Sequence, residues 1–169
     1  MRSMIVALAT LGVASACSVQ SIPNANVPTV PTLAGAWRSR LTVRDGAFLP
    51  MKDLEFLYAF NTGGTMTESS NYDEAAPVPP AYGVWRQTGT NKFEAKYLYY
   101  VTKPPAKLQE LTGGGGWEPT GYGTIVETIT LANDGQSYES TIAYDLFDAA
   151  GKPAPGSGHA TAHGTRIQF

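Results

Sequence analysis

The sequence is poor in cysteine and histidine. It contains one cysteine, Cys17, and two histidines among its 169 residues. A single cysteine excludes an internal disulfide framework and a cysteine-rich zinc site. The histidines, His159 and His163, lie four residues apart on a predicted strand, which separates them by about 13 Å and prevents them from sharing a metal ion. We therefore expect no metal site, and no thiol chemistry in the domain that follows Cys17.

Charged residues are also scarce. They make up 15% of the chain, with 14 acidic and 12 basic residues and a net charge of −2, so no basic excess is available to attract nucleic acid. The glycine run at 113–116 lacks the Lys and Ser or Thr of a phosphate-binding loop, and no Gly-x-Ser-x-Gly motif is present. We therefore expect neither a nucleic-acid partner nor a cofactor. The apolar fraction of 43% still suffices for a hydrophobic core.

No apolar run is long enough to span a bilayer as a helix. The run at 5–13 would reach about 14 Å, at about 1.5 Å per residue, against a bilayer core of about 30 Å. It follows the positively charged Arg2 and precedes the small residues Ala14, Ser15 and Ala16. These features predict a secretory signal peptide over residues 1–16.

Cys17 comes directly after those small residues. The arrangement resembles the lipobox of bacterial lipoproteins, in which the cleaved chain begins with a diacylated cysteine. The resemblance implies a lipid anchor at Cys17 and a protein tethered to a membrane of the cell envelope. The family usually has Leu where this chain has Ala14, and the pattern Ala14-x-Ala16 also suits an ordinary secretory peptidase. A secreted or periplasmic protein without a lipid is therefore the alternative.

The rest of the chain divides into a linker and one domain. Residues 17–32 contain three prolines and no periodicity, which predicts an extended linker. Within 33–169, apolar and polar residues alternate as they do in half-buried strands, with Trp37 and Leu41 on one face and Arg38 on the other. The predicted strands are 36–43, 54–60, 65–70, 82–87, 92–101, 123–131, 137–147 and 158–167.

The lengths of the connections favour a barrel over a sandwich. Those after the second, fourth and sixth strands are short. Long connections are predicted after the other strands, at 45–53, 71–81, 102–121 and 148–155. Alternate connections of an up-and-down barrel lie at the same end, so the long loops would gather at one mouth. We therefore predict an all-β fold, an eight-stranded antiparallel up-and-down barrel with room for side chains or one small ligand.

Two short motifs link the ends of this domain to a known family. The first strand opens with Gly35-Ala36-Trp37, and the last ends with Gly164-Thr165-Arg166-Ile167. This resembles the lipocalin (calycin) family, in which an Arg of the last strand packs over the Trp of the first. The resemblance implies that Trp37 and Arg166 close the base of the barrel through a cation–π contact, worth about 0.5–2 kcal/mol. The chain lacks the family's Thr-Asp-Tyr-type motif and C-terminal helix, which indicates a diverged bacterial member.

The interior has two possible arrangements. If Arg166 points inward, period two also turns Gly158, Ala160, Ala162 and Gly164 inward, which leaves space opposite. Aromatic side chains then either fill this space as a solid core or line a cavity for a small apolar or aromatic molecule. The candidate ligand-binding residues are Tyr58, Trp85, Tyr97, Tyr99, Glu127, Tyr138 and Tyr144.

Glu127 shares a face with Ile125, Ile129 and Leu131. If that face is inward, the carboxylate needs a partner, and Arg166 or tyrosine hydroxyls are the candidates. Glu127 is then either a structural hydrogen-bonded group or a general acid–base with a raised pKa. Glu68 poses the same question, with a solvent-facing orientation favoured.

Three functions remain open from the sequence. The favoured one is non-catalytic: an exported, monomeric barrel that binds a small hydrophobic or aromatic molecule and touches a membrane only through its lipid anchor. The second is a cofactor-free isomerase or cyclase that uses Glu127 and a tyrosine. The third is a structural protein of the cell envelope with a solid barrel. Fold alone does not decide among them.

Overall fold

The computed structural model describes residues 31–72, 80–103, 105–107, 109, 116 and 118–169. The predicted signal peptide, the lipid anchor at Cys17 and nearly all of the predicted linker lie outside these residues. Among the described residues, no helix has the length and hydrophobicity to cross a membrane.

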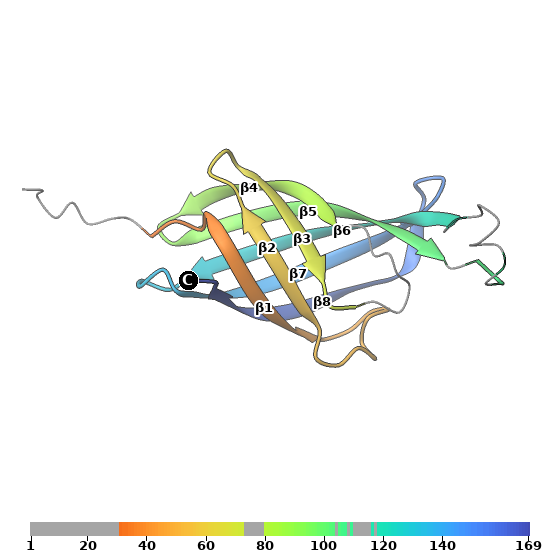
Figure 1. The fold of residues 1–169 in the computed structure, drawn as a ribbon, viewed down its shortest axis with the longest axis horizontal. Helices are drawn as coiled ribbons and strands as arrows, with labels where there is room; N and C mark the ends of the chain where they lie inside the picture. Colours follow the sequence, from red (N-terminus) through yellow and green to blue (C-terminus); the bar gives the residue numbers. More distant parts are fainter. Residues whose placement is uncertain (1–30, 73–79, 104, 108, 110–115, 117) are drawn as a thin grey trace, which may run out of the picture.

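The eight strands form a closed antiparallel barrel (Figure 1). Each strand pairs with its neighbours in the chain, and β1 pairs with β8 to close the ring. The strands are β1 (Gly35–Val43), β2 (Glu55–Phe60), β3 (Thr65–Ser70), β4 (Ala81–Gly89), β5 (Lys92–Lys103), β6 (Glu118–Leu131), β7 (Ser137–Asp148) and β8 (Pro153–Arg166). The predicted all-β class and up-and-down topology are confirmed, and both are consistent with a lipocalin-like fold.

Alternation along β8 sorts its residues between the two faces of the wall. The small residues predicted to point inward, Gly158 to Gly164 at every second position, are buried. His159 and His163 point outward, where their Nδ1 atoms lie 3.2 Å from a carboxylate oxygen of Asp45 and 2.7 Å from one of Glu139. The inward-facing small residues make room for large rings on the neighbouring strand.

Those rings come from β7. Gly164 pairs with Tyr138, and a Cβ at Gly164 would overlap the Tyr138 ring. Gly158 pairs with Tyr144, and a Cβ there would lie 2.6 Å from the Tyr144 hydroxyl. Small and large residues therefore interlock on this wall, as the solid-core interpretation requires.

The two ends of the barrel differ. The short turns 61–64, 90–91 and 132–136 lie at the end where β1 begins, and β1, β3 and β5 end at the opposite end. Figure 1 shows the short turns and the C-terminus together on the left. We call these the closed end and the mouth.

The prediction of a long loop at 148–155 was wrong. β7 and β8 continue to a tight turn, in which the Asp148 carboxylate accepts hydrogen bonds from the amides of Ala150 and Lys152, both at 2.9 Å. Pro153 pairs with Phe147 in the ladder, and a β-bulge between Tyr144 and Leu146 accommodates the change of register.

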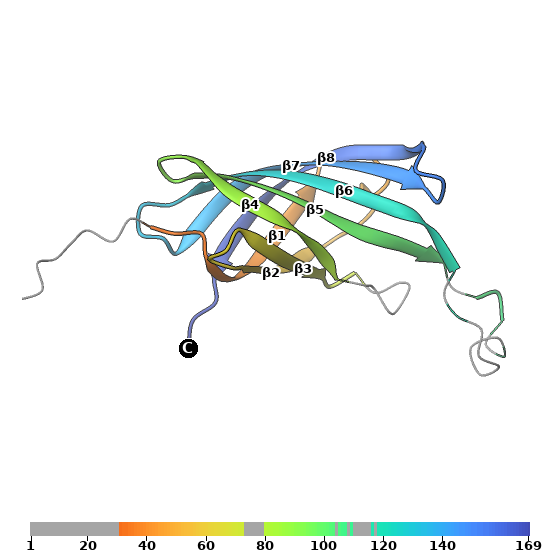
Figure 2. The ribbon, with the colours of Figure 1, turned by 90° about the horizontal axis from the view of Figure 1, so that it is seen from above.

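The barrel wall is uneven in height. β5 to β8 have 12 to 14 residues each, whereas β2 and β3 have six. Figure 2 shows the long strands extending beyond the short ones toward the mouth. The mouth is therefore bordered by the long strands β5 to β8 on one side and by the short strands β2 and β3, with loops, on the other.

Candidate ligand-binding site

Arg166 and Trp37 meet at the closed end. The guanidinium carbon lies 4.2 Å from the centroid of the Trp37 ring. Arg166 also donates hydrogen bonds to the backbone carbonyls of Thr32, Ala34 and Gly135, at 2.6, 2.8 and 2.8 Å. Trp37 is fully buried and donates its indole N–H to the carbonyl of Leu33 at 2.8 Å. The arginine thus ties the chain entering the barrel to the last strand and to the β6–β7 turn.

Gly35 makes this closure possible. Its φ of +133° belongs to a region that other residues rarely adopt. A Cβ at this position would lie 2.5 Å from Nη1 of Arg166. The glycine of the Gly-x-Trp motif therefore leaves space for the arginine that covers the tryptophan.

The part of the barrel interior near the closed end is filled with aromatic rings. Tyr138 packs on Trp37 with ring centroids 5.1 Å apart. Trp85 also lies near the closed end, where its indole N–H donates to the carbonyl of Asn61 at 2.9 Å and its ring contacts Phe60 and Phe93. Trp85 is thus part of the closure of the barrel and does not line the cavity described below.

Glu127 lies inside this filled region and is fully buried. Its Oε2 accepts hydrogen bonds from the hydroxyls of Tyr58 at 2.9 Å and Tyr97 at 3.2 Å. The two hydroxyl oxygens are themselves 2.9 Å apart. Arg166, one of the partners considered from the sequence, bonds backbone carbonyls at the closed end instead. Tyrosine hydroxyls, not a cation, therefore hold this carboxyl group.

The burial of this cluster changes its acid–base behaviour. Burial raises the pKa of Glu127, and the neighbouring hydroxyl groups act in the opposite direction because they favour its charged form. Burial, followed by the charge of Glu127, raises the pKa values of Tyr58 and Tyr97 well above the ordinary tyrosine value. Both tyrosines therefore remain protonated donors at any physiological pH.

Glu68 is a second buried carboxyl group, and its predicted orientation was wrong. Its residue is only 6% exposed, because β3 turns Met66 and Glu68 inward. Burial, and secondarily the charge of Glu127, raises the pKa of Glu68 to about 8. Its Oε1 has no hydrogen-bond partner within the part of the chain that the structure describes.

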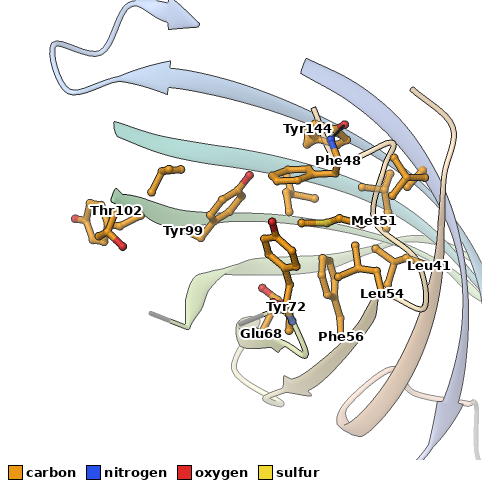
Figure 3. Close-up of a pocket in the computed structure, with 17 residues that line it drawn as sticks. Leu41, Phe48, Met51, Leu54, Phe56, Glu68, Tyr72, Tyr99, Thr102 and Tyr144 are labelled. Carbon is orange, nitrogen blue, oxygen red and sulfur yellow. Dashed lines mark hydrogen bonds between the residues drawn. The ribbon is translucent and has the colours of Figure 1, made fainter. Parts of the chain in front are cut away.

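Glu68 borders a cavity of about 180 Å³ at the mouth (Figure 3). The residues around it are mostly apolar or aromatic. They are Leu41, Val43, Phe48, Met51, Leu54, Phe56, Glu68, Ser70, Tyr72, Tyr99, Tyr100, Val101, Thr102, Ile125, Ile142, Tyr144 and Ala160. Glu68 is the one carboxyl group among them, and no Lys, Arg or His is present in this set.

Two predicted ligand-binding tyrosines reach the cavity. The Tyr144 hydroxyl donates to the carbonyl of Asp45 at 2.7 Å, and its ring packs on Phe48 at 5.0 Å, which fixes the β1–β2 connection over one side of the mouth. Tyr99 lies above Gly123, where a Cβ would overlap the tyrosine ring. The Tyr99 hydroxyl is buried without a hydrogen-bond partner among the described residues.

The structure therefore separates the predicted residues by depth. Tyr99 and Tyr144 line the cavity, whereas Tyr58, Tyr97, Tyr138 and Glu127 belong to the filled region below it. Sequence reasoning missed Phe48 and Met51, which cover the cavity from the β1–β2 connection. The available signal was the presence of apolar side chains within a predicted mouth loop.

Comparison with known proteins identifies no relative of this chain. No protein-family model, curated protein or solved structure matches the chain. Among the described residues, no group of three or more His, Cys, Asp or Glu side chains could hold a metal ion.

Proposed function

We propose that this chain is an exported lipocalin-like barrel protein, a diverged bacterial member of that family, that binds a small hydrophobic or aromatic molecule at its mouth. The apolar cavity of about 180 Å³ above a filled base carries the proposal. An apolar cavity of about 150 Å³ is enough to hold benzene. The cavity therefore suits a ligand with one aromatic ring or a comparable apolar group, with the remainder extending into the mouth.

The start of β1 at the closed end supports a role at a membrane surface. Residues 1–17 support export and lipidation at Cys17 by their sequence pattern alone. β1 starts at the closed end, so a tether of residues 17–32 would leave the mouth facing away from the membrane. Growth of the bacterial host with a labelled fatty acid tests this tether, because Cys17→Ser should abolish labelling while the wild-type chain is labelled.

The two other functions fit the geometry less well. A cofactor-free isomerase based on Glu127 requires this carboxyl to reach the ligand, but Glu127 is fully buried and does not line the cavity. A solid structural barrel describes the lower part of the interior but leaves the cavity at the mouth without a role.

Displacement of a neutral fluorescent probe tests the binding proposal. N-phenyl-1-naphthylamine should fluoresce on binding and be displaced by organic extracts of the host's membranes. Ala160→Leu adds a larger side chain on the cavity wall and should weaken probe binding. Ala143→Leu is the matched control, because Ala143 is exposed on the outer face of the adjacent strand. Equal probe binding by both variants and the wild-type protein would contradict the proposal.

A further inference from the structure

The polar side chains that line the cavity are one carboxyl group and several hydroxyl groups. Among the described residues that line it, Glu68 has the one ionisable carboxyl, the remaining polar side chains are hydroxyls, and no side chain is basic. A ligand carboxylate would find no cation among these lining residues. It would also lie next to the Glu68 carboxyl group, whose charged form is already disfavoured by burial. The cavity is therefore unsuited to fatty acids and other apolar anions.

Glu68 also has an unused acceptor. It is 6% exposed, it borders the cavity, and its Oε1 has no hydrogen-bond partner among the described residues. Leaving a buried acceptor unpaired is costly in a protein interior. The hydroxyl of Tyr99, which lines the same cavity, is also buried without a hydrogen-bond partner among the described residues. Figure 3 shows both residues bordering the cavity. A ligand with several hydrogen-bond donors would satisfy both groups.

The aromatic rings of the wall favour a positively charged donor. Phe56, Tyr72 and Tyr99 line the same cavity as Glu68. The face of an aromatic ring attracts a cation, and more strongly when the cation has lost its water. A protonated amine combines positive charge with up to three donors, whereas a neutral hydroxyl offers one.

From these observations we propose that the ligand is an apolar or aromatic amine, bound as its cation with the ammonium group on the Glu68 carboxylate and its apolar body against the cavity wall. This inference rests on the proposed function and narrows the class of ligand. It assigns Glu68 as the residue that selects amines over anions of the same size.

The surroundings of Glu68 predict how such binding depends on pH. Within the described part of the chain, the titratable groups coupled electrostatically to Glu68 are Glu127, Tyr58, Tyr97 and Tyr99, and none of these is basic. With a pKa of about 8, Glu68 is ionised in about one molecule in ten at pH 7 and in about nine in ten at pH 9. Alkylamines remain mostly protonated over this range, so the affinity for an amine should rise about tenfold.

Three probes of similar shape test the inference by calorimetry on the purified protein: 4-phenylbutylamine, 4-phenylbutan-1-ol and 4-phenylbutanoate. The amine should bind tightest at pH 9 and weaken about tenfold at pH 7, while the alcohol changes less than about twofold. The alkanoate should bind weakest at both pH values. Because this ranking is measured on the unaltered protein, it decides the question whether or not a variant folds.

Glu68→Gln should remove both the preference for the amine and its pH dependence while retaining alcohol binding. Glu139→Gln is the matched control on the outer face, where Glu139 contacts His163, and it should behave as wild type. Equal, pH-independent binding of all three probes, or tightest binding of the alkanoate, would overturn the inference and leave the proposed function standing. Failure of all three probes would also overturn it. Failure of the neutral fluorescent probe, in contrast, counts against the proposed function itself.

Discussion

The buried carboxyl of Glu68 should make the stability of the barrel fall as the pH rises. Its pKa is raised from the ordinary value of 4.5 to about 8 in the folded chain. Between these values the unfolded chain has lost the proton that the folded chain still holds. The free energy of unfolding therefore decreases by about 1.4 kcal/mol per pH unit, and by about 5 kcal/mol in all. The stability that the protonated Glu68 carboxyl contributes is fully present below pH 4.5 and is lost above pH 8.

Urea unfolding at pH 5, 6, 7 and 8 measures this effect when wild type is compared with Glu68→Gln. Glutamine has nearly the same shape and does not ionise, so the variant lacks this slope. The difference in unfolding free energy, variant minus wild type, should grow by about 1.4 kcal/mol per pH unit up to pH 8 and then level off. Glu127, whose pKa is also raised, retains its own contribution in both proteins.

Glu139→Gln removes a carboxyl from the exposed face and is the control for this experiment. Its stability difference from wild type should show no such slope, because Glu139 is largely exposed. A pH-independent difference between Glu68→Gln and wild type would refute the reasoning. That result would mean that Glu68 is ionised in the folded protein at neutral pH, or is hydrated there.

Other substitutions test the closed end and the buried cluster. Arg166→Ala removes the cation from Trp37 together with three hydrogen bonds to backbone carbonyls, and should cost about 2–3 kcal/mol in urea unfolding. Gly35→Ala places a Cβ against Arg166 at a positive φ and should cost about 1–3 kcal/mol, seen as a lower melting temperature. Tyr58→Phe removes a donor to Glu127 and should cost about 1–3 kcal/mol, with a larger loss at pH 8 than at pH 5 because that hydrogen bond favours the carboxylate. Wild-type melting temperatures in these variants would contradict the roles assigned to the closed end and the cluster.

Much of the fold was predictable because alternation with period two is a local signal. It identified all eight strands, and the alternation of short and long connections indicated the barrel. The signal failed where pairing partners decide the structure. Residues 148–155 were predicted as a loop, but the Asp148 turn and the pairing of Pro153 with Phe147 place most of them in the β7–β8 hairpin.

The site was less predictable because alternation indicates a face and not a depth. Tyr97 and Tyr99 lie two residues apart on β5 and both point inward, yet Tyr97 is sealed beside Glu127 and Tyr99 lines the cavity. How far along the barrel a side chain sits depends on strand register and length, which are set by residues distant in sequence. Glu68 shows the same limit, since its orientation follows from pairing with Tyr58 across β2 and β3.

The two buried acids differ in what the structure provides for them. Each has one carboxyl oxygen without a hydrogen-bond partner among the described residues. The other oxygen of Glu127 accepts hydrogen bonds from two tyrosine hydroxyls, and Glu127 does not line the cavity. Glu68 borders the cavity, and its raised pKa means that it costs stability at neutral pH. An apolar residue at that position would pack against the same neighbours without this cost. Departures from good packing and hydrogen bonding are expected where a protein binds something, and two of the unpaired buried groups, on Glu68 and Tyr99, border the cavity. The position of Glu68, more than the presence of the cavity alone, therefore points to a ligand that would supply the missing charge and donors.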